Sequence, residues 1–269
     1  MLTLQNDQLT VQVLDPIADA TRFGPRYCTG GYIFQIDDVS HGSLLSGPTY
    51  PDSFNRFDGQ GIPDAFNLGP LRGRGDEALL LGIGKCDLTA NTVLEFCRWN
   101  VEQADTMLRF TTQHVYQDWG VELIRTVGLS NRTVRSHTSL HNIGRAPVPL
   151  RWFPHPFYPQ PTDDELCRFD IPVDFAADDP GYARADSGFI RRKNGPWTQG
   201  YYLPLSHEAT APLTVLQRHP KLGLVAASCS YAPDFFPIWG NPQTFSWEPF
   251  LERTVAAGQT LNWYIDYHF

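Results

Sequence analysis

Two short motifs carry the side chains of this chain that are best suited to proton transfer. The first, Arg-Trp-Phe-Pro-His-Pro-Phe-Tyr at residues 151–158, holds His155 between two prolines. The second, Phe-Ser-Trp-Glu-Pro-Phe at residues 245–250, holds Glu248. A histidine or glutamate within such apolar, proline-stiffened strands is costly unless it is paired, hydrogen-bonded or used in chemistry. An imidazole and a carboxyl group held on opposite sides of a substrate can act as acid and base on a polyol or a sugar.

We therefore expect His155 and Glu248 to point into one concave surface. Their side chains should stand about 5–8 Å apart, so that a pyranose ring fits between an acid and a base that each contact it. The alternative is a structural role for each residue. His155 would then be a core histidine bonded to a backbone carbonyl, and Glu248 would form an ion pair with Arg253 or Arg151.

The rest of the chain predicts β-structure almost throughout. The 22 prolines argue against long helices. We predict an all-β fold, a large antiparallel β-sandwich in which two large sheets face each other. No break in composition divides the chain, so we treat residues 1–269 as a single domain. Apolar and polar residues alternate with the period of a half-buried strand over residues 2–4, 9–14, 106–114, 121–129, 135–140, 213–216, 222–228 and 260–267.

Two stretches are rich in turn-forming residues and are predicted to be irregular. Residues 43–75 carry many Gly, Pro, Asp and Asn, and residues 163–200 are acidic and then glycine-rich. Long loops in a compact sandwich are often functional. We expect the first stretch to line the mouth of the site, with Arg56, Gln60 and Asp64 as its polar groups.

Composition narrows the possible partners and cofactors. The net charge of −8 disfavours nucleic acids and anionic membranes as partners. The sequence has no apolar run of about 18 residues and no basic leader before an apolar stretch, so we expect neither a membrane span nor a signal peptide. The five cysteines form no Cys-x-x-Cys motif, and no histidines and carboxylates have metal-ligand spacing. We therefore expect reduced thiols in a cytoplasmic protein, with no metal or other cofactor.

Several motifs resemble those of the galactose mutarotase-like proteins, the aldose 1-epimerase superfamily. Residues 140–150, followed by His155-Pro156-Phe157, resemble the family's L-x-N-x-G-x-x-P-x-P … H-P-[FY]-F segment. The similarity follows the chain from end to end, and it is firmest over residues 138–160 and 213–269. The segments that resemble the family's final third are residues 216–223, Trp239-Gly240-Asn241, Glu248-Pro249 and the turn at 257–261.

The resemblance implies a function for the two motifs. In the family, the histidine at the position of His155 is the general acid that protonates the ring oxygen of the sugar. The glutamate at the position of Glu248 is the general base that takes the proton of the anomeric hydroxyl. Ring opening, rotation about C1–C2 and re-closure then interconvert the α and β anomers. This chemistry needs proton transfer alone, so the resemblance implies an isomerase of carbohydrate metabolism without metal or redox cofactor.

The resemblance also suggests a cation that faces the substrate. An early Asn-Arg pair is typical of the family, and Asn55-Arg56 is the nearest match in this chain. Arg22 and Arg26 lie in a neighbouring segment and are rivals for the same role.

Other residues are candidates for sugar binding. The family's early His-Gly motif falls on residues 57–66, which hold no histidine. Gln60 and Asp64 are the polar groups available there as substitutes. Tyr158 and Trp239 could each stack on a pyranose face, although aromatic residues are also common in β cores.

Three further functions remain open from the sequence. The missing early histidine leaves room for a carbohydrate-binding protein that lacks catalysis, because fold does not settle function. An epimerase of phosphorylated sugars would need several arginines at the rim of the site, which the early segments supply. A glycoside lyase or hydrolase is disfavoured, because hydrolysis normally needs two well-placed carboxylates.

Overall fold

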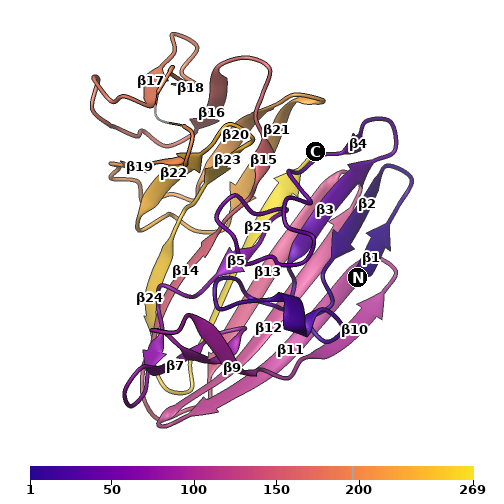
Figure 1. Cartoon of the computed structure of the whole chain (residues 1–269), viewed down its shortest axis with the longest axis vertical. Coiled ribbons are helices and arrows are strands. Elements are labelled where there is room, and N and C mark those ends of the chain that lie inside the picture. Colours follow the sequence, from indigo (N-terminus) through magenta and orange to yellow (C-terminus); the bar gives the residue numbers. More distant parts are fainter. Residues whose placement is uncertain (196) are drawn as a thin grey trace.

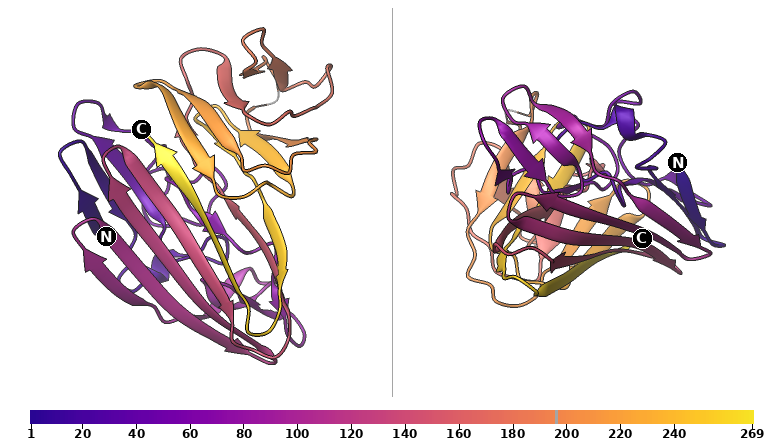
Figure 2. Two further views of the ribbon diagram at one scale, coloured as in Figure 1. Left: turned by 180° about the vertical axis from the view of Figure 1, so that it is seen from behind. Right: turned by 90° about the horizontal axis from the view of Figure 1, so that it is seen from below.

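The computed structural model describes residues 1–195 and 197–269, and these consist almost entirely of antiparallel strands and loops. The helical content of the described residues is one 3₁₀ turn, η1 (Ala20–Arg22). The predicted all-β class is therefore confirmed. The long strands form one layer, and the shorter strands and loops lie against it (Figures 1 and 2).

A ten-stranded antiparallel sheet is the base of the fold. Its long middle strands lie side by side when the molecule is seen from behind (Figure 2). The last strand in chain order, β25, lies inside this sheet, between β13 and β21. In spatial order the strands are β10 (Asn100–Ala104), β11 (Met107–Tyr116), β12 (Trp119–Ser130), β13 (Thr133–Asn142), β25 (Thr260–His268), β21 (Gly223–Cys229), β20 (Thr214–His219), β16 (Glu165–Phe169), β18 (Ile190–Arg192) and β17 (Tyr182–Arg184).

The alternation of side chains in β12 explains how this sheet is covered. Leu123, Arg125, Val127 and Leu129 are buried, and the residues between them are partly exposed. Since successive side chains of a strand point to opposite faces, one face of the sheet packs into the protein and the other meets solvent. Arg125 is the exception in this row, because it brings a charge to the inner face.

Four smaller sheets complete the fold, so the layer of the predicted sandwich opposite the large sheet is divided rather than continuous. Alternation identifies strands but not their partners. In spatial order these sheets are β1 (Leu2–Gln5), β2 (Leu9–Val13), β3 (Ile33–Asp38) and β4 (Gly42–Ser43); β6 (Leu71–Arg72), β7 (Glu77–Leu80), β8 (Gly84–Asp87) and β9 (Thr92–Phe96); β24 (Leu251–Val255), β14 (Val148–Pro154) and β5 (Asp64–Ala65); and β15 (Tyr158–Pro159), β23 (Thr244–Trp247), β22 (Phe236–Gly240) and β19 (Tyr201–Leu205).

The two stretches predicted to be irregular differ from each other. Residues 43–75 are mostly loop, with the end of β4 and the two-residue strands β5 and β6. Residues 163–200 instead contain β16, β17 and β18, which extend the ten-stranded sheet. Strands this short are hidden in the sequence by the turn residues around them.

Two clusters of buried side chains matter for the site. The main core draws on residues from Leu4 to Tyr267 and lies against the large sheet. Because both ends of the chain contribute to it, we keep the single-domain prediction. A second cluster is aromatic and surrounds His155, with Tyr27, Phe157 and Trp239 among its members. Within the described ranges, we find no helix with the length and apolar character needed to cross a membrane.

Candidate active site

His155 is the first residue after β14, at the point where the chain leaves the sheet. The flanking Pro154 and Pro156 restrict the backbone on both sides. The backbone N–H of His155 donates to the carbonyl of Pro63 at 2.8 Å. Its imidazole stacks on the ring of Phe157, with 4.1 Å between centroids. The local sequence thus fixes both the backbone and the ring plane of this histidine.

Glu248 occupies the equivalent position after β23. Its backbone N–H donates to the carbonyl of Pro237 at 2.9 Å, and Pro249 follows it directly. The carboxyl oxygen Oε1 lies 3.3 Å from Nε2 of His155, and both side chains are buried. The structure therefore brings together the two groups that the sequence singled out, although they are 93 residues apart (248 − 155).

The separation of the two side chains differs from the one we expected. A gap of about 5–8 Å would admit a sugar ring between acid and base. The 3.3 Å contact leaves no such gap. The expectation assumed that the two groups approach the ring from opposite faces, and the structure places them side by side instead.

Burial shifts both pKa values toward an uncharged pair. Desolvation lowers the pKa of His155 well below its usual value, and the positive charge of Arg26 lowers it further. Desolvation raises the pKa of Glu248 to about 8, against a smaller opposing effect of Arg26. Both directions favour an uncharged pair, with Glu248 protonated and His155 neutral.

The hydrogen bonds of the imidazole agree with this neutral state. A neutral imidazole whose Nε2 faces a protonated Glu248 carries its own proton on Nδ1. Nδ1 lies 3.0 Å from Oγ of Ser246, which can accept that proton's hydrogen bond. The roles expected from the sequence resemblance would place the Glu248 proton on the histidine, one transfer across the 3.3 Å contact away.

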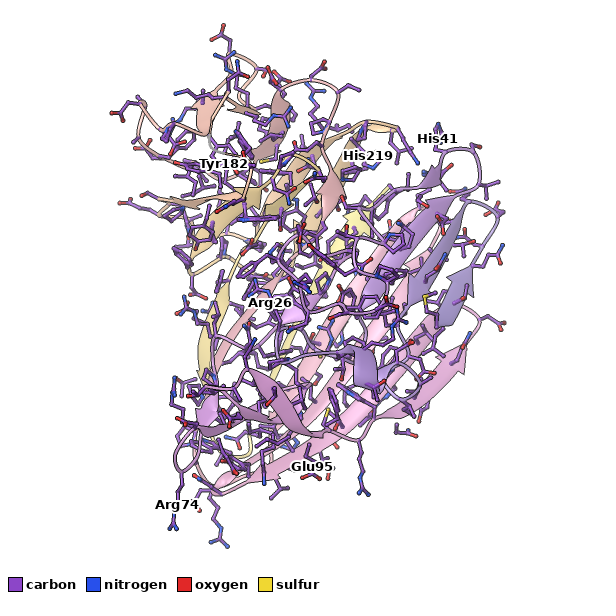
Figure 3. The ribbon with its side chains drawn as sticks, in the orientation of Figure 1. Arg26, His41, Arg74, Glu95, Tyr182 and His219 are labelled. Atoms are coloured by element: carbon purple, nitrogen blue, oxygen red, sulfur yellow. The ribbon has the colours of Figure 1, made fainter. Side chains whose placement is uncertain are left out.

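Arg26 is the cation whose charge shifts the pKa values of both members of the pair. It is half-buried, and its Nε donates to the hydroxyl of Tyr27 at 3.1 Å. Its guanidinium lies over the ring of Phe57, 4.0 Å from the centroid. Figure 3 places Arg26 in the middle of the molecule. Of the rival arginines, this one is the cation whose charge acts on both His155 and Glu248.

Two of the predicted sugar-binding residues lie near the site. Trp239 packs edge-on against the imidazole of His155, with 5.7 Å between centroids. Arg56 is exposed and lies 5.0 Å from the centroid of the Tyr50 ring. Its backbone carbonyl accepts a hydrogen bond from the Tyr27 hydroxyl at 3.3 Å, which links this loop to the segment that carries Arg26.

The structure places Gln60 and Asp64 in the interior rather than at a mouth of the site. Gln60 is fully buried, and its side-chain amide donates to the carbonyl of Tyr50 at 2.8 Å. Asp64 is paired with Arg125 in the core. Because Asp64 lies opposite Pro154 in the β5–β14 ladder, its side chain points to the face away from His155. We expected these two residues to line the mouth of the site from a loop. Composition alone does not show that their side chains interact with interior groups instead.

Tyr158 is also turned away from the imidazole. It is buried in the main core, and its ring stacks on Trp247 with 6.3 Å between centroids. Burial raises the pKa of its hydroxyl. The sequence left stacking on sugar and core packing open for this residue, and its surroundings favour packing.

Sequence reasoning missed Ser246, which contacts the imidazole, and Arg125, which pairs with Asp64 in the core. Ser246 contacts the imidazole from the second motif, and its place two residues before Glu248 on a strand was a usable signal, since both side chains then share a face. Arg125 was hidden within a strand that reads as ordinary alternation. Its signal was a charge in the inward register between Leu123 and Val127.

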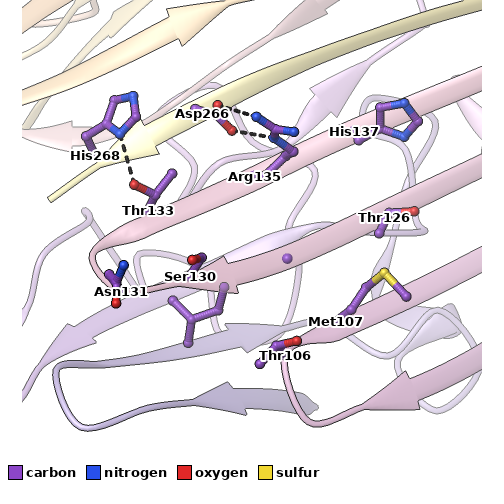
Figure 4. Close-up of a pocket in the computed structure, with 12 residues that line it drawn as sticks. Thr106, Met107, Thr126, Ser130, Asn131, Thr133, Arg135, His137, Asp266 and His268 are labelled. Carbon is purple, nitrogen blue, oxygen red and sulfur yellow. Dashed lines mark hydrogen bonds and ion pairs between the residues drawn. The ribbon is translucent and has the colours of Figure 1, made fainter.

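A hollow on the large sheet offers no rival site. It lies over β11, β12, β13 and β25, and two of its titratable lining residues, Arg135 and Asp266, pair with each other (Figure 4). Arg135 contacts Asp266 through two hydrogen bonds of 2.7 Å, and His268 lies 3.0 Å from the Thr133 hydroxyl. Across the described part of the chain, no three His, Cys, Asp or Glu side chains gather as metal ligands.

Several solved structures share this architecture at remote sequence similarity. No protein-family model matches the chain, and no curated protein matches its sequence. The galactose mutarotase related enzyme of Lactobacillus acidophilus matches with a TM-score of 0.66 and 13% identity, over 100% of this chain and 97% of that one. This chain has the galactose mutarotase-like fold.

Two further structures with the galactose mutarotase-like fold agree. A galactose mutarotase-like protein of Clostridium acetobutylicum matches with a TM-score of 0.60 and 14% identity, over 99% of this chain and 94% of that one. The galactose 1-epimerase of Lactobacillus acidophilus NCFM matches with a TM-score of 0.54 and 12% identity, over 99% and 92%. The fold predicted from the motifs is thereby confirmed, and at these identities the argument for activity has to come from the site.

Proposed function

We propose that this chain is an aldose 1-epimerase-like isomerase that interconverts the α and β anomers of a sugar. The observation that carries the proposal is the buried 3.3 Å contact between His155 and Glu248 in a galactose mutarotase-like fold. An acid–base pair whose members have strongly shifted pKa values is typical of a site that moves protons.

The reaction needs one proton delivered and one removed. In the proposed roles, His155 protonates the ring oxygen O5 and Glu248 takes the proton of the O1 hydroxyl. The C1–O5 bond breaks and a carbonyl forms at C1. After rotation about C1–C2, the same steps run in reverse on the other face of the carbonyl, so atoms and protons balance and no metal or nucleotide is consumed.

The side-by-side arrangement suits this reaction because O1 and O5 are bonded to the same carbon. An acid and a base that are neighbours can therefore reach both oxygens from the C1 edge of the ring. A sugar entering in this way replaces the His155–Glu248 contact with one hydrogen bond to each group.

One shared proton sets the pH range of this mechanism. The resting pair holds it on Glu248, and transfer to His155 produces the acid and the base that the reaction uses. Both arrangements lose that proton near the Glu248 pKa of about 8. We therefore expect activity to fall at higher pH.

The surrounding side chains would hold the sugar. We assign Trp239 to contact with a C–H face of the ring and Arg26 and Arg56 to hydrogen bonds with its hydroxyls. Gln60, Asp64 and Tyr158 are not part of this proposal, because their polar atoms or rings are directed into the interior.

Polarimetry and saturation-transfer NMR on freshly dissolved aldoses test the proposal directly. We expect faster anomer interconversion than in buffer, without added metal. Glu248→Gln should remove the base and His155→Asn the acid, and each should reduce kcat by roughly two or more orders of magnitude. If the protein binds sugars but leaves mutarotation at its uncatalysed rate across a broad panel, the chain instead has a carbohydrate-binding role.

Phosphorylated sugars are a second class of substrate that one observation favours. Within the described ranges, neither Arg26 nor Arg56 forms an ion pair with a carboxylate. Two such guanidinium groups near the pair match the needs of a phosphate, which arginine binds well. A hexose and its 6-phosphate, compared by kcat/KM, separate the two classes. Arg56→Ala should reduce the value for the phosphate more than the value for the hexose.

A further inference from the structure

A second buried pair, Arg125 with Asp64, lies in the core outside the candidate site. Their side chains are 1% and 3% exposed. The Arg125 guanidinium donates to the Asp64 carboxylate and to the hydroxyls of Thr138 and Ser136, the last at 3.1 Å. Replacing such a pair with apolar residues of similar volume is often neutral or stabilising. Stability alone therefore does not explain the pair.

The pair is also incompletely bonded. Among the described residues, Oδ1 of Asp64 and Nε of Arg125 have no hydrogen-bond partner. Desolvation raises the pKa of Asp64 even though Arg125 opposes it. A buried polar group without a partner costs free energy, so the pair retains part of its desolvation cost.

The backbone around Asp64 supports both sides of the candidate site. Pro63 accepts the hydrogen bond of the His155 N–H at 2.8 Å, and Gly61 accepts that of Phe157 at 2.8 Å. On the other side, the Asp64 carbonyl accepts the N–H of Cys28 at 2.8 Å. Cys28 directly follows Arg26 and Tyr27. Residues 61–65 thus join the segment that carries the histidine to the segment that carries the cation.

The ladder with β14 alone gives this segment little to fix its register, although Gly61 and Ile62 also donate backbone hydrogen bonds to Ser46 and Ile33. β5 has two residues and lies at the edge of a three-stranded sheet. A slip of one residue would turn every side chain to the opposite face and move the carbonyl that holds His155. The ion pair adds to these bonds in opposing such a slip, because the Asp64 carboxylate finds its guanidinium on one face only.

We propose that Arg125 is a positioning residue for the acid–base pair. Through Asp64 it fixes the register of residues 61–65, and through the Pro63 carbonyl it fixes the orientation of His155. Arg125 does not contact a substrate in this role. The kinetic part of this inference rests on the proposed function, and the structural part does not.

The test uses the full chain with both charges removed together. Arg125→Met alone leaves a buried carboxylate unpaired and is prone to unfold, so Arg125→Met with Asp64→Leu is the informative variant. We expect this double variant to fold, with a Tm close to that of the wild type. Its kcat should fall roughly 10- to 100-fold with little change in KM, because misplacement of a reacting group costs rate rather than affinity.

Imidazole NMR of His155 gives a readout that does not depend on activity. In the wild type we expect one set of ¹⁵N resonances for a neutral ring with its proton on Nδ1. In the double variant these resonances should shift, broaden or split. The single variant Arg125→Lys, which keeps a cation beside Asp64, should give resonances closer to those of the wild type. A folded double variant with unchanged His155 resonances would overturn the inference, whatever the enzyme activity of the wild type.

A matched control comes from the outer face of the same sheet. Arg135 pairs with Asp266 across β13 and β25, and Arg135 is 51% exposed. Arg135→Met with Asp266→Leu makes the same chemical change without touching residues 61–65. It should leave both kcat and the His155 resonances as in the wild type. Equal losses in both double variants would assign the effect to the sheet in general and overturn the positioning role.

Discussion

Two buried pairs of titratable side chains lie on opposite faces of the same short ladder, and they differ in what surrounds them. Asp64 points from β5 toward the large sheet and meets a guanidinium that is always charged. His155, next to the Pro154 that pairs with Asp64, points the other way and meets a carboxyl group with a pKa of about 8. Burial is common to both pairs. What sets the second apart is a proton that can move at ordinary pH, which is what catalysis requires.

The largest expected difference between the pairs is in stability. Arg125→Met leaves the Asp64 carboxylate buried without its partner and should reduce the free energy of unfolding by about 3–5 kcal/mol. His155→Asn removes a neutral ring from the other pair and should cost far less. Urea unfolding followed by tryptophan fluorescence measures both. A similar loss in the free energy of unfolding for the two variants would mean that the two pairs do not differ in their contribution to stability.

The second difference is in the response to pH. The pKa of Glu248 is raised from 4.5 to about 8, so the folded protein keeps a proton that the unfolded chain releases above pH 4.5. The stability that this proton contributes is complete below pH 4.5 and is lost as the pH rises through about 8. Glu248→Gln has no such loss, so its stability relative to the wild type should rise by up to about 1.4 kcal/mol per pH unit in that window. Unfolding curves at several pH values test this, and a constant difference would place the Glu248 pKa near its usual value.

The third difference is within the loop that we expected to line the site. Gln60→Ala should cost about 1–3 kcal/mol, because the Tyr50 carbonyl then loses the side-chain N–H that bonds it in the interior. Arg56→Ala, on the exposed side of the same loop, should leave the Tm almost unchanged. If Gln60→Ala is equally harmless and weakens sugar binding, Gln60 belongs to the site after all.

The smallest expected effect concerns Arg26. Its charge lowers the pKa of Glu248, so Arg26→Met should move the alkaline limb of the kcat/KM profile to higher pH, on the order of half a unit. The acid limb should move the same way, because Arg26 also lowers the pKa of His155. Arg135→Met, on the far face of the large sheet, is the control and should leave both limbs in place.

The sequence predicted the strands and the acid–base pair for clear physical reasons. Period-2 alternation exposes half-buried strands such as β11, β12 and β25, and an isolated charge among prolines and aromatics marks His155 and Glu248. Alternation does not say which strands pair, so the division into one large and four small sheets was not predictable. Nor does it show which way a loop residue turns, and for this reason Gln60 and Asp64 were expected at a surface. The 3.3 Å contact depends on where β14 and β23 end relative to each other, which no local pattern encodes.

The central place of β25 in the ten-stranded sheet has a consequence for synthesis on the ribosome. β25 pairs with both β13 and β21, yet it follows every other strand in chain order. Until residues 260–268 have been translated and have left the exit tunnel, both neighbouring strands present an unpaired edge, and the sheet remains in two halves. Unpaired edges invite pairing with other nascent chains. The two halves of this sheet therefore join only when β25 arrives, and the yield of native protein should depend on holding them apart from other chains until then.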